Sequence, residues 1–180
     1  MLNALIITFC RVVILLVFGM SFIGKLSNVT AFQAAVTNFR ILSPNWSRRA
    51  AWIFLIGEFV VVVLTIMGGN ALLIGFLIAV FLLTIFSIAL GIALIRRLQV
   101  PCNCFGREEK PISPYDLVRN GSFIVCILIG VDVLWTADGL IASLGFANII
   151  LAGLMGATFV MILTNLSEIV QLYNQPTILK

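Results

Sequence analysis

Residues 71–95 read ALLIGFLIAVFLLTIFSIALGIALI and contain no charged side chain. A helix needs about 20 apolar residues to cross the hydrocarbon core of a bilayer, and this run is long enough for one crossing. Arg96 and Arg97 follow immediately, and a basic pair suits the C-terminal end of a helix at a headgroup surface. The stretch therefore predicts a transmembrane helix.

Four further apolar segments flank this run, at residues 4–26, 50–67, 114–135 and 143–173. The chain of 180 residues is 62% hydrophobic and 10% charged, and its apolar residues come in continuous runs instead of alternating with polar ones. We therefore expect an all-α, polytopic membrane protein that forms one integral membrane domain over residues 1–180. Its environment is the lipid bilayer, and the predicted bundle has a four-helix core and a fifth, C-terminal transmembrane helix.

A short amphipathic helix is expected after the first span, within residues 27–40. Its apolar side chains repeat at helical spacing and share one face: Val29, Phe32, Val36 and Phe39. Ser27 is the expected N-cap of this helix, and Ser43 with Pro44 suits the cap and first turn of the next one. The helix is predicted to lie at the membrane interface or to fold back on the bundle.

Small and polar residues mark the other boundaries. Gly68 and Gly69 predict a tight turn between the second and third spans. Ser113 and Asp116 have the spacing of a capping box at the start of the fourth span. In the last segment, small residues at four-residue spacing permit close helix packing: Ala152, Gly153, Gly156 and Ala157.

The polar loop at residues 98–113 contains the sequence Pro101-Cys102-Asn103-Cys104-Phe105-Gly106. Two thiols one residue apart can close a small, strained disulfide ring, and strain makes a disulfide more oxidising. Arginine and lysine side chains nearby in the sequence favour the reactive thiolate. The same pair can instead bind a soft metal such as Cu(I), or have no function. Cys102 and Cys104 are therefore the candidate catalytic residues, with redox chemistry as the favoured use.

The chain contains no histidine, which excludes Ser–His and Cys–His catalytic arrangements and imidazole metal sites. A zinc site needs about four ligands, more than one close pair of cysteines supplies, so no metal site is assigned. The formal charge is +4. Because the basic residues cluster beside membrane segments, we interpret them as headgroup anchors and not as a nucleic-acid surface.

Two charged residues lie inside predicted spans, Arg11 in the first and Glu58 in the second. At 1.5 Å per residue, Arg11 lies roughly 11 Å and Glu58 roughly 14 Å from the same membrane face. Intramembrane charges are costly and usually pair inside the bundle, so these two side chains are predicted to form an ion pair. The pair either fixes the register of the two helices or forms a polar site for a quinone headgroup or for proton movement.

Cys10 and Cys126 are the remaining thiols. Cys10 lies roughly 9 Å from one membrane face, and Cys126 lies a turn or more into the fourth span from the opposite face. We therefore expect that they do not meet and that each packs as a small apolar residue. A role of Cys126 as a resolving thiol on the CxC side is the alternative.

The basic residues also predict an orientation. The loops after the first and third spans and the C-terminal tail share one side of the membrane, which holds Lys25, Arg40, Arg48, Arg49, Arg96, Arg97, Arg107, Lys110, Arg119 and Lys180. The opposite side holds only Asp132 and Asp138. By the positive-inside rule, the protein is a multi-pass protein of the cytoplasmic membrane whose CxC loop faces the cytoplasm.

In these features the chain resembles the MauE/DoxX-like membrane proteins, most closely the methylamine-utilisation MauE type, over roughly residues 5–135. The C-x-C-F-G motif with a downstream Arg-Asn is the specific part of the resemblance. Asn103 stands where the family pattern more often has glycine. The residues that carry the resemblance are Arg11, Gly24-Lys25, Asn38-Phe39-Arg40-Ile41-Leu42-Ser43-Pro44, Glu58, Arg96-Arg97, Cys102-Asn103-Cys104-Phe105-Gly106 and Arg119-Asn120.

The resemblance implies a helical bundle related to the vitamin K epoxide reductase-like and disulfide-forming membrane proteins. It implies thiol–disulfide exchange at Cys102 and Cys104 that assists oxidative folding of a partner protein with thiols or disulfides. A quinone is the candidate electron acceptor, near Glu58 and Arg11. A non-enzymatic membrane assembly or scaffold protein with a structural or metal-binding CxC is the alternative. Oxidative folding also favours the extracytoplasmic side, where disulfides persist, and so conflicts with the charge count.

Overall fold

The computed structural model describes residues 2–39, 43–97, 113–136, 146–166 and 168–170. Five of the helices in these ranges are long and apolar enough to cross a membrane, which confirms the predicted all-α, multi-pass fold. Of the fifth predicted span, residues 143–145 and 171–173 lie outside the described ranges. The helices are α1 (Leu2–Ser27), α2 (Val29–Asn38), α3 (Pro44–Met67), α4 (Asn70–Ile95), α5 (Pro114–Thr136) and α6 (Phe146–Thr164).

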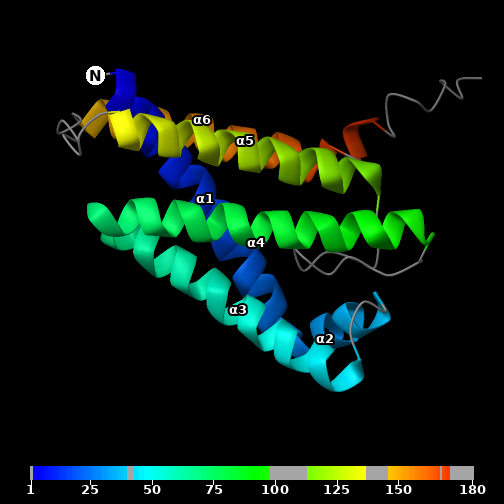
Figure 1. The fold of residues 1–180 in the computed structure, drawn as a ribbon. Coiled ribbons are helices and arrows are strands. Elements are labelled where there is room, and N and C mark those ends of the chain that lie inside the picture. Colours follow the sequence, from blue (N-terminus) through cyan, green and yellow to red (C-terminus); the bar gives the residue numbers. More distant parts are fainter. Residues whose placement is uncertain (1, 40–42, 98–112, 137–145, 167, 171–180) are drawn as a thin grey trace, which may run out of the picture.

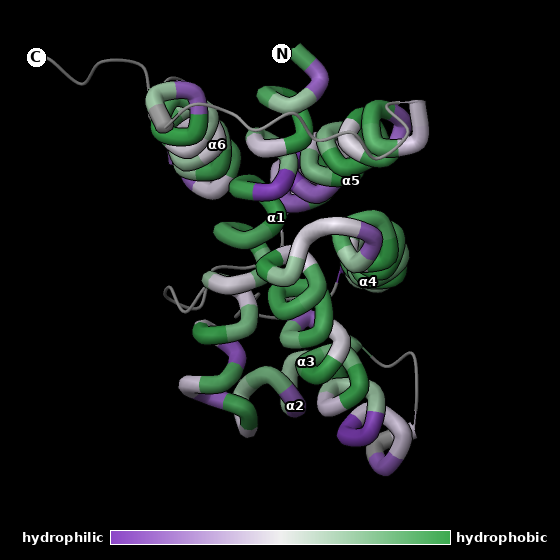
Figure 2. The backbone as a smooth tube through the Cα atoms, turned by 90° about the vertical axis from the view of Figure 1, so that its left-hand side faces the viewer, coloured by the Kyte–Doolittle hydropathy of each residue, from purple (hydrophilic) through white to green (hydrophobic). Residues whose placement is uncertain are grey.

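Helix α1 is at the centre of the bundle and crosses it obliquely (Figure 1). It packs against α3, α5 and α6 and also contacts α2. Seen along the bundle in Figure 2, α5 and α6 flank one side of α1, and α2 and α3 lie on the other. The fully buried core includes one large side chain from each of four helices: Ile14, Val61, Phe76 and Phe123. Because α1 is in the middle of the bundle, its polar residues can meet side chains from most of the other helices.

Helices α3 and α4 form an antiparallel hairpin with a tight turn at Gly68 and Gly69, as predicted. Both glycines have positive φ angles, 70° and 57°, which other residues adopt at a cost. Farther along, a Cβ atom at Gly75 would lie 3.2 Å from Cβ of Leu64 and 3.3 Å from Oγ1 of Thr65. The two helices therefore approach closely just after the turn.

Helix α6 packs against α1 through part of the predicted small-residue pattern. Ala152 is fully buried, and a Cβ atom at Gly156 would lie 3.0 Å from Cγ1 of Val12 on α1. A Cβ atom at Gly153, by contrast, would have no neighbour within 4 Å. The four-residue spacing from Ala152 to Gly156 thus forms the helix contact, and Gly153 lies beside it.

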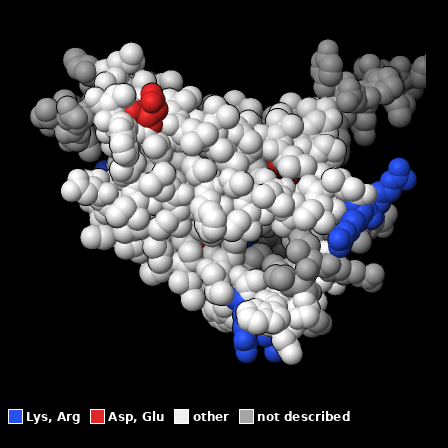
Figure 3. All heavy atoms as spheres, in the orientation of Figure 1, with Lys and Arg blue, Asp and Glu red and all other residues white. Residues whose placement is uncertain are grey.

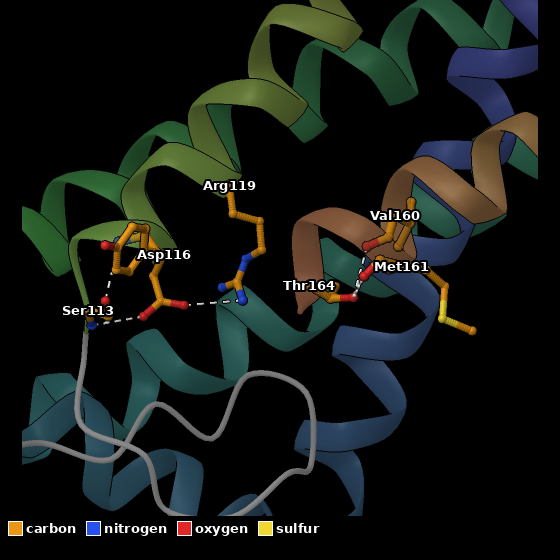
Figure 4. Close-up of polar contacts among 7 residues, drawn as sticks. Ser113, Asp116, Arg119, Val160, Met161 and Thr164 are labelled. Atoms are coloured by element: carbon orange, nitrogen blue, oxygen red, sulfur yellow. Dashed lines mark hydrogen bonds and ion pairs between the residues drawn. The ribbon is translucent and has the colours of Figure 1, made fainter. Parts of the chain in front are cut away.

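The helix starts agree with the predicted caps in two of three cases. Asn28, not Ser27, caps α2, since its side chain accepts from the N–H of Ala31 over 3.1 Å. Ser27 Oγ donates instead to the carbonyl of Gly24. At α5 the predicted capping box is present: the N–H of Ser113 donates to Asp116 Oδ2 over 2.9 Å (Figure 4). Ser43 occupies the cap position of α3 without a side-chain hydrogen bond.

Charges are divided between the two ends of the bundle (Figure 3). Exposed arginines lie near the start of α3 and just after α4: Arg48, Arg49, Arg96 and Arg97. Asp132 is exposed near the opposite end, in the last turns of α5. Two residues predicted to be headgroup anchors are instead inside the bundle, because Lys25 is 2% exposed and Arg119 is 7% exposed. The asymmetry of exposed charge persists without them.

Candidate functional site

A buried ion pair joins α1 to α3 in the interior of the bundle. Lys25 Nζ donates to Glu58 Oε1, and the two side chains are 2% and 3% exposed. Ser21 lies one turn before Lys25; its Oγ donates to Glu58 Oε1 over 2.9 Å and accepts from Lys25 Nζ over 2.9 Å. These three side chains therefore bind one another through Glu58 Oε1, in surroundings where an isolated charge is costly.

Three phenylalanine rings surround the ammonium group of Lys25. Its Nζ lies 5.0 Å from the ring centroid of Phe32 on α2, 4.6 Å from that of Phe54 on α3 and 5.5 Å from that of Phe86 on α4. A cation at such distances is attracted by the negative face of an aromatic ring. Four helices thus position one charge, and α2 folds back on the bundle to complete the cage.

Helix α5 brings Arg119 and Asn120 to the same place. Together with the Lys25–Glu58 pair they line a small cavity of about 30 Å³. Figure 4 shows Arg119 pointing from α5 toward the bundle interior, where its Nη1 lies 3.2 Å from Asp116 Oδ1. Asp116 also accepts from the N–H of Ser113 at the start of α5. One carboxylate therefore fixes both the first turns of α5 and the side chain of Arg119.

Two polar atoms at this cavity have no hydrogen-bond partner among the described residues, the acceptor Glu58 Oε2 and the donor Asn120 Nδ2. The cavity is large enough for one or two water molecules. Pockets that hold small organic ligands commonly measure about 300–1,000 Å³, roughly ten times more. A cavity of this size suits bound water, and a quinone site at Glu58 and Arg11 stays a prediction.

The predicted ion pair between Arg11 and Glu58 is wrong. Arg11 Nε donates to the carbonyl of Thr65 over 2.9 Å, and Nη2 donates to that of Ile66 over 2.7 Å. These carbonyls belong to the last turn of α3, where carbonyls lack helical partners and a cation is favoured. Gly68 leaves room for the guanidinium, since a Cβ atom there would lie 3.3 Å from Nη2.

The expectation that Cys10 and Cys126 do not meet is also wrong. Their sulfur atoms lie 3.7 Å apart, and both side chains are buried. Helices α1 and α5 run in opposite directions (Figure 1), so similar distances from the start of α1 and from the end of α5 mean similar depth. The sequence prediction took the depth of Cys126 from the start of α5. That distance does not show that the two cysteines lie at similar depth in the membrane.

Cys102 and Cys104 lie outside the described residues, as does the rest of the segment 98–112. The segment joins the end of α4 to the start of α5, and both of these helix ends lie at the arginine-rich end of the bundle (Figures 1 and 3). Arg119 and Asn120 are in the second turn of α5, directly after this segment. The buried polar cluster is therefore closer to this end of α5 than to the other.

The sequence model of the family described as Methylamine utilisation protein MauE matches residues 3–135. The chain belongs to this family. The match spans α1 to α5 and includes the entire polar cluster, whereas α6 lies beyond it. Among the residues that carry the MauE resemblance, Lys25, Glu58, Arg119 and Asn120 line the same cavity. No curated protein and no solved structure matches the chain.

Sequence reasoning does not identify Ser21 and Lys25 as members of a MauE polar site. Lys25 lies at the end of an apolar run, where a lysine usually extends to the headgroups. The available signal is the spacing: Ser21 and Lys25 are four residues apart and therefore share one helical face. A second polar residue one helical turn before a lysine near the end of a span indicates that this face of the helix points into the bundle.

Proposed function

We propose that this MauE-family protein is a membrane thiol–disulfide oxidoreductase that assists maturation of a partner protein. Cys102 and Cys104 are its redox pair. The observation that supports the proposal most is the convergence of Lys25, Glu58, Arg119 and Asn120 on one buried cavity. These residues carry the family resemblance together with the C-x-C-F-G motif. The segment that contains the motif follows α4 and precedes α5. The end of α4 and the start of α5 lie at the same end of the bundle.

The buried cluster has a positioning role in this proposal. The ion pair connects α1 to α3, the phenylalanine cage adds α2 and α4, and Asp116 fixes the start of α5. Helices α1, α2 and α3 are thereby connected to α4 and α5, the two helices that flank the CxC segment. No thiol lines the cluster's cavity among the described residues, so in this proposal the cluster supports the redox segment and the thiols carry the chemistry.

The chemistry is a pair of thiol–disulfide exchanges. A thiolate of the partner attacks the Cys102–Cys104 disulfide, the S–S bond breaks, and a mixed disulfide forms while the other cysteine leaves as a thiolate. A second thiolate of the partner then attacks the mixed disulfide. The partner gains one disulfide, and Cys102 and Cys104 receive its two electrons as a dithiol. The strain of a ring with a single intervening residue favours electron transfer in this direction.

Thiol trapping in cells tests the proposal. Acid quenching followed by alkylation with a maleimide of high mass should show a fraction of Cys102 and Cys104 in the oxidised form. In Cys104→Ser, the thiolate of Cys102 should attack a disulfide of the partner and release one partner thiolate, and the reducible mixed disulfide should accumulate because Cys104 is not present to resolve it. Cys102→Ser/Cys104→Ser should accumulate none. The matched control is Cys10→Ser/Cys126→Ser, which leaves the CxC motif intact and should retain the partner's disulfides.

A permanently reduced Cys102–Cys104 pair would contradict the proposal if the double serine variant also left every partner disulfide intact. That result would favour the alternative of a non-enzymatic assembly or scaffold protein. In methylamine utilisation, the pathway named by the family description, such a protein would bind its partner without exchanging electrons with it.

A further inference from the structure

A second pair of thiols lies inside the membrane-spanning part of the bundle. Cys10 on α1 donates from Sγ to the carbonyl of Cys126 on α5 over 3.2 Å, and the two sulfur atoms are 3.7 Å apart. The residues are 1% and 7% exposed. A disulfide has an S–S distance of about 2.05 Å, so the sulfurs would have to approach by about 1.6 Å. Side-chain rotation can supply much of this movement.

The absence of a side chain at Gly130 permits this contact. Gly130 lies one turn after Cys126, and a Cβ atom there would lie 3.1 Å from Cβ and 3.2 Å from Sγ of Cys10. It would also lie 2.7 Å from Cε2 of Phe76, a distance that real Cβ atoms essentially never show. The glycine thus allows α1 and α5 to approach until the sulfurs are in contact.

The thiol pair lines an apolar groove of about 710 Å³. Helix α1 lines the groove with Ile6 and Phe9, α5 lines it with residues from Val118 to Ile129, and α6 lines it with Phe159. Figure 2 shows α5 and α6 on the same side of α1, in agreement with this arrangement. Val125 and Ile129 on the α5 wall are 57% and 50% exposed, so the groove is open on its outer flank.

We propose that Cys10 and Cys126 form an intramembrane redox pair that a lipid-soluble quinone oxidises from this groove. The groove is surrounded by apolar side chains at membrane depth, so an oxidant must dissolve in hydrocarbon to reach the sulfurs. Its volume is within the usual range for organic ligands and is much larger than that of the cavity at Glu58. This inference does not rest on the proposed function of Cys102 and Cys104.

The reaction balances with the quinone as the acceptor. Two S–H bonds break and one S–S bond forms between Cys10 and Cys126. The two electrons and two protons that are released reduce the quinone to a quinol. No charge has to remain in the apolar groove, because each electron is accompanied by a proton, and an unpaired charge there would be costly.

The test uses the full chain in lipid vesicles with Cys102→Ser/Cys104→Ser as the background, so that only Cys10 and Cys126 report. The reduced protein is exposed to decylubiquinone, and the loss of thiols is followed by a mass-tagged maleimide after denaturation. We expect two thiols to disappear together within one chain. A parallel sample with diamide, a membrane-permeable oxidant much smaller than a quinone, tests whether the two sulfurs can form a disulfide without requiring space for a quinone ring.

A matched pair of variants tests the groove itself. Gly121 lines the groove and Gly153 does not, and a Cβ atom at either would have no neighbour within 4 Å. Gly121→Leu should slow oxidation by decylubiquinone about tenfold, because the added side chain occupies the space of the ring. It should leave oxidation by diamide unchanged, and Gly153→Leu should leave both rates unchanged. Equal unfolding midpoints of the two variants show that the comparison is between folded proteins.

Three results would overturn the inference. Thiols that survive both oxidants exclude a redox pair at Cys10 and Cys126. Oxidation by diamide but not by decylubiquinone excludes the quinone. Equal quinone rates in Gly121→Leu and Gly153→Leu exclude the groove as the route. Each result leaves the proposal for Cys102 and Cys104 unaffected, because both residues are serine in this experiment.

Discussion

Lys25 and Glu58 form an ion pair that is inaccessible to solvent, with side chains 2% and 3% exposed. Buried ion pairs are weak evidence for stability, because removing two charges from water offsets much of their attraction. Their loss is nevertheless costly when only one partner is removed. The pair fixes which face of α1 lies against α3, and the cage of phenylalanine rings makes any other rotation of α1 unfavourable.

Removing one charge of the pair should destabilise the bundle. Glu58→Gln leaves the ammonium of Lys25 buried and uncompensated, and we expect a loss of about 3–5 kcal/mol in the free energy of unfolding. Lys25→Met in addition to Glu58→Gln should restore much of that loss, because no uncompensated charge remains. The measurement is the midpoint of unfolding in a sodium dodecyl sulfate titration.

Arg11→Leu is the control for this rescue, since Arg11 does not contact Glu58. In the Glu58→Gln background it should add its own loss of stability instead of restoring any. Rescue by Arg11→Leu, without rescue by Lys25→Met, would contradict the ion-pair assignment.

Arg11 should stabilise the turn between α3 and α4. Arg11→Leu removes two hydrogen bonds from a charged donor to the last carbonyls of α3, and we expect a loss of about 2–3 kcal/mol. Faster hydrogen exchange should be confined to the last turn of α3 and the first turn of α4. Arg11→Lys keeps the charge but cannot donate from two separate nitrogen atoms. Its stability should therefore lie between that of the wild type and that of Arg11→Leu. Uniform acceleration across α3 would contradict this local role.

Gly130→Ala should separate α1 from α5. The added methyl group meets Phe76 at 2.7 Å and Cys10 at 3.1 Å, so we expect overpacking to cost about 1–3 kcal/mol. It should also slow oxidation of the Cys10–Cys126 pair by diamide. Gly121→Ala on the same helix has open space and should be neutral or slightly stabilising. Equal unfolding midpoints for the two alanine variants would show that the close contact is absent.

The sidedness of the CxC segment can be measured with a variant whose only cysteine is Cys104. The exposed arginines at this end of the bundle predict a cytoplasmic location. A membrane-impermeant maleimide should therefore label Cys104 only after the membrane is permeabilised. Labelling in intact cells would contradict the charge argument and would put the CxC segment on the side where disulfides persist.

The fold was predictable because membrane thickness limits each helix to a run of about 20 apolar residues. Gly68 and Gly69 mark the end of α3 and the start of α4, and Ser113 with Asp116 marks the start of α5. Asn28 replaced Ser27 as the cap of α2 because adjacent polar residues compete for one position. Such a shift is within the usual uncertainty of helix ends.

The site was less predictable because sequence spacing gives the depth of a residue but not the direction that it faces. Arg11 and Glu58 have similar depths, yet Arg11 turns to the end of α3. Lys25 is long enough to reach Glu58 from the last turn of α1. Rotation of a helix about its axis depends on packing against its neighbours, here on the contacts of Gly130 and Gly156 with α1. The four-residue spacing of Ser21 and Lys25 indicates which face of α1 is polar, but it does not identify the helix that this face contacts.

The central position of α1 has a consequence for biogenesis. Helix α1 is synthesised first, but the partners of both its basic residues are on α3: Glu58 for Lys25, and the carbonyls of Thr65 and Ile66 for Arg11. Glu58 emerges from the ribosome 33 residues after Lys25. The first span therefore enters the lipid with two unmatched cations, and it becomes favourable there only when α3 arrives. We therefore expect insertion of the first and second spans to be coupled, because α3 supplies the partners of both cations on α1.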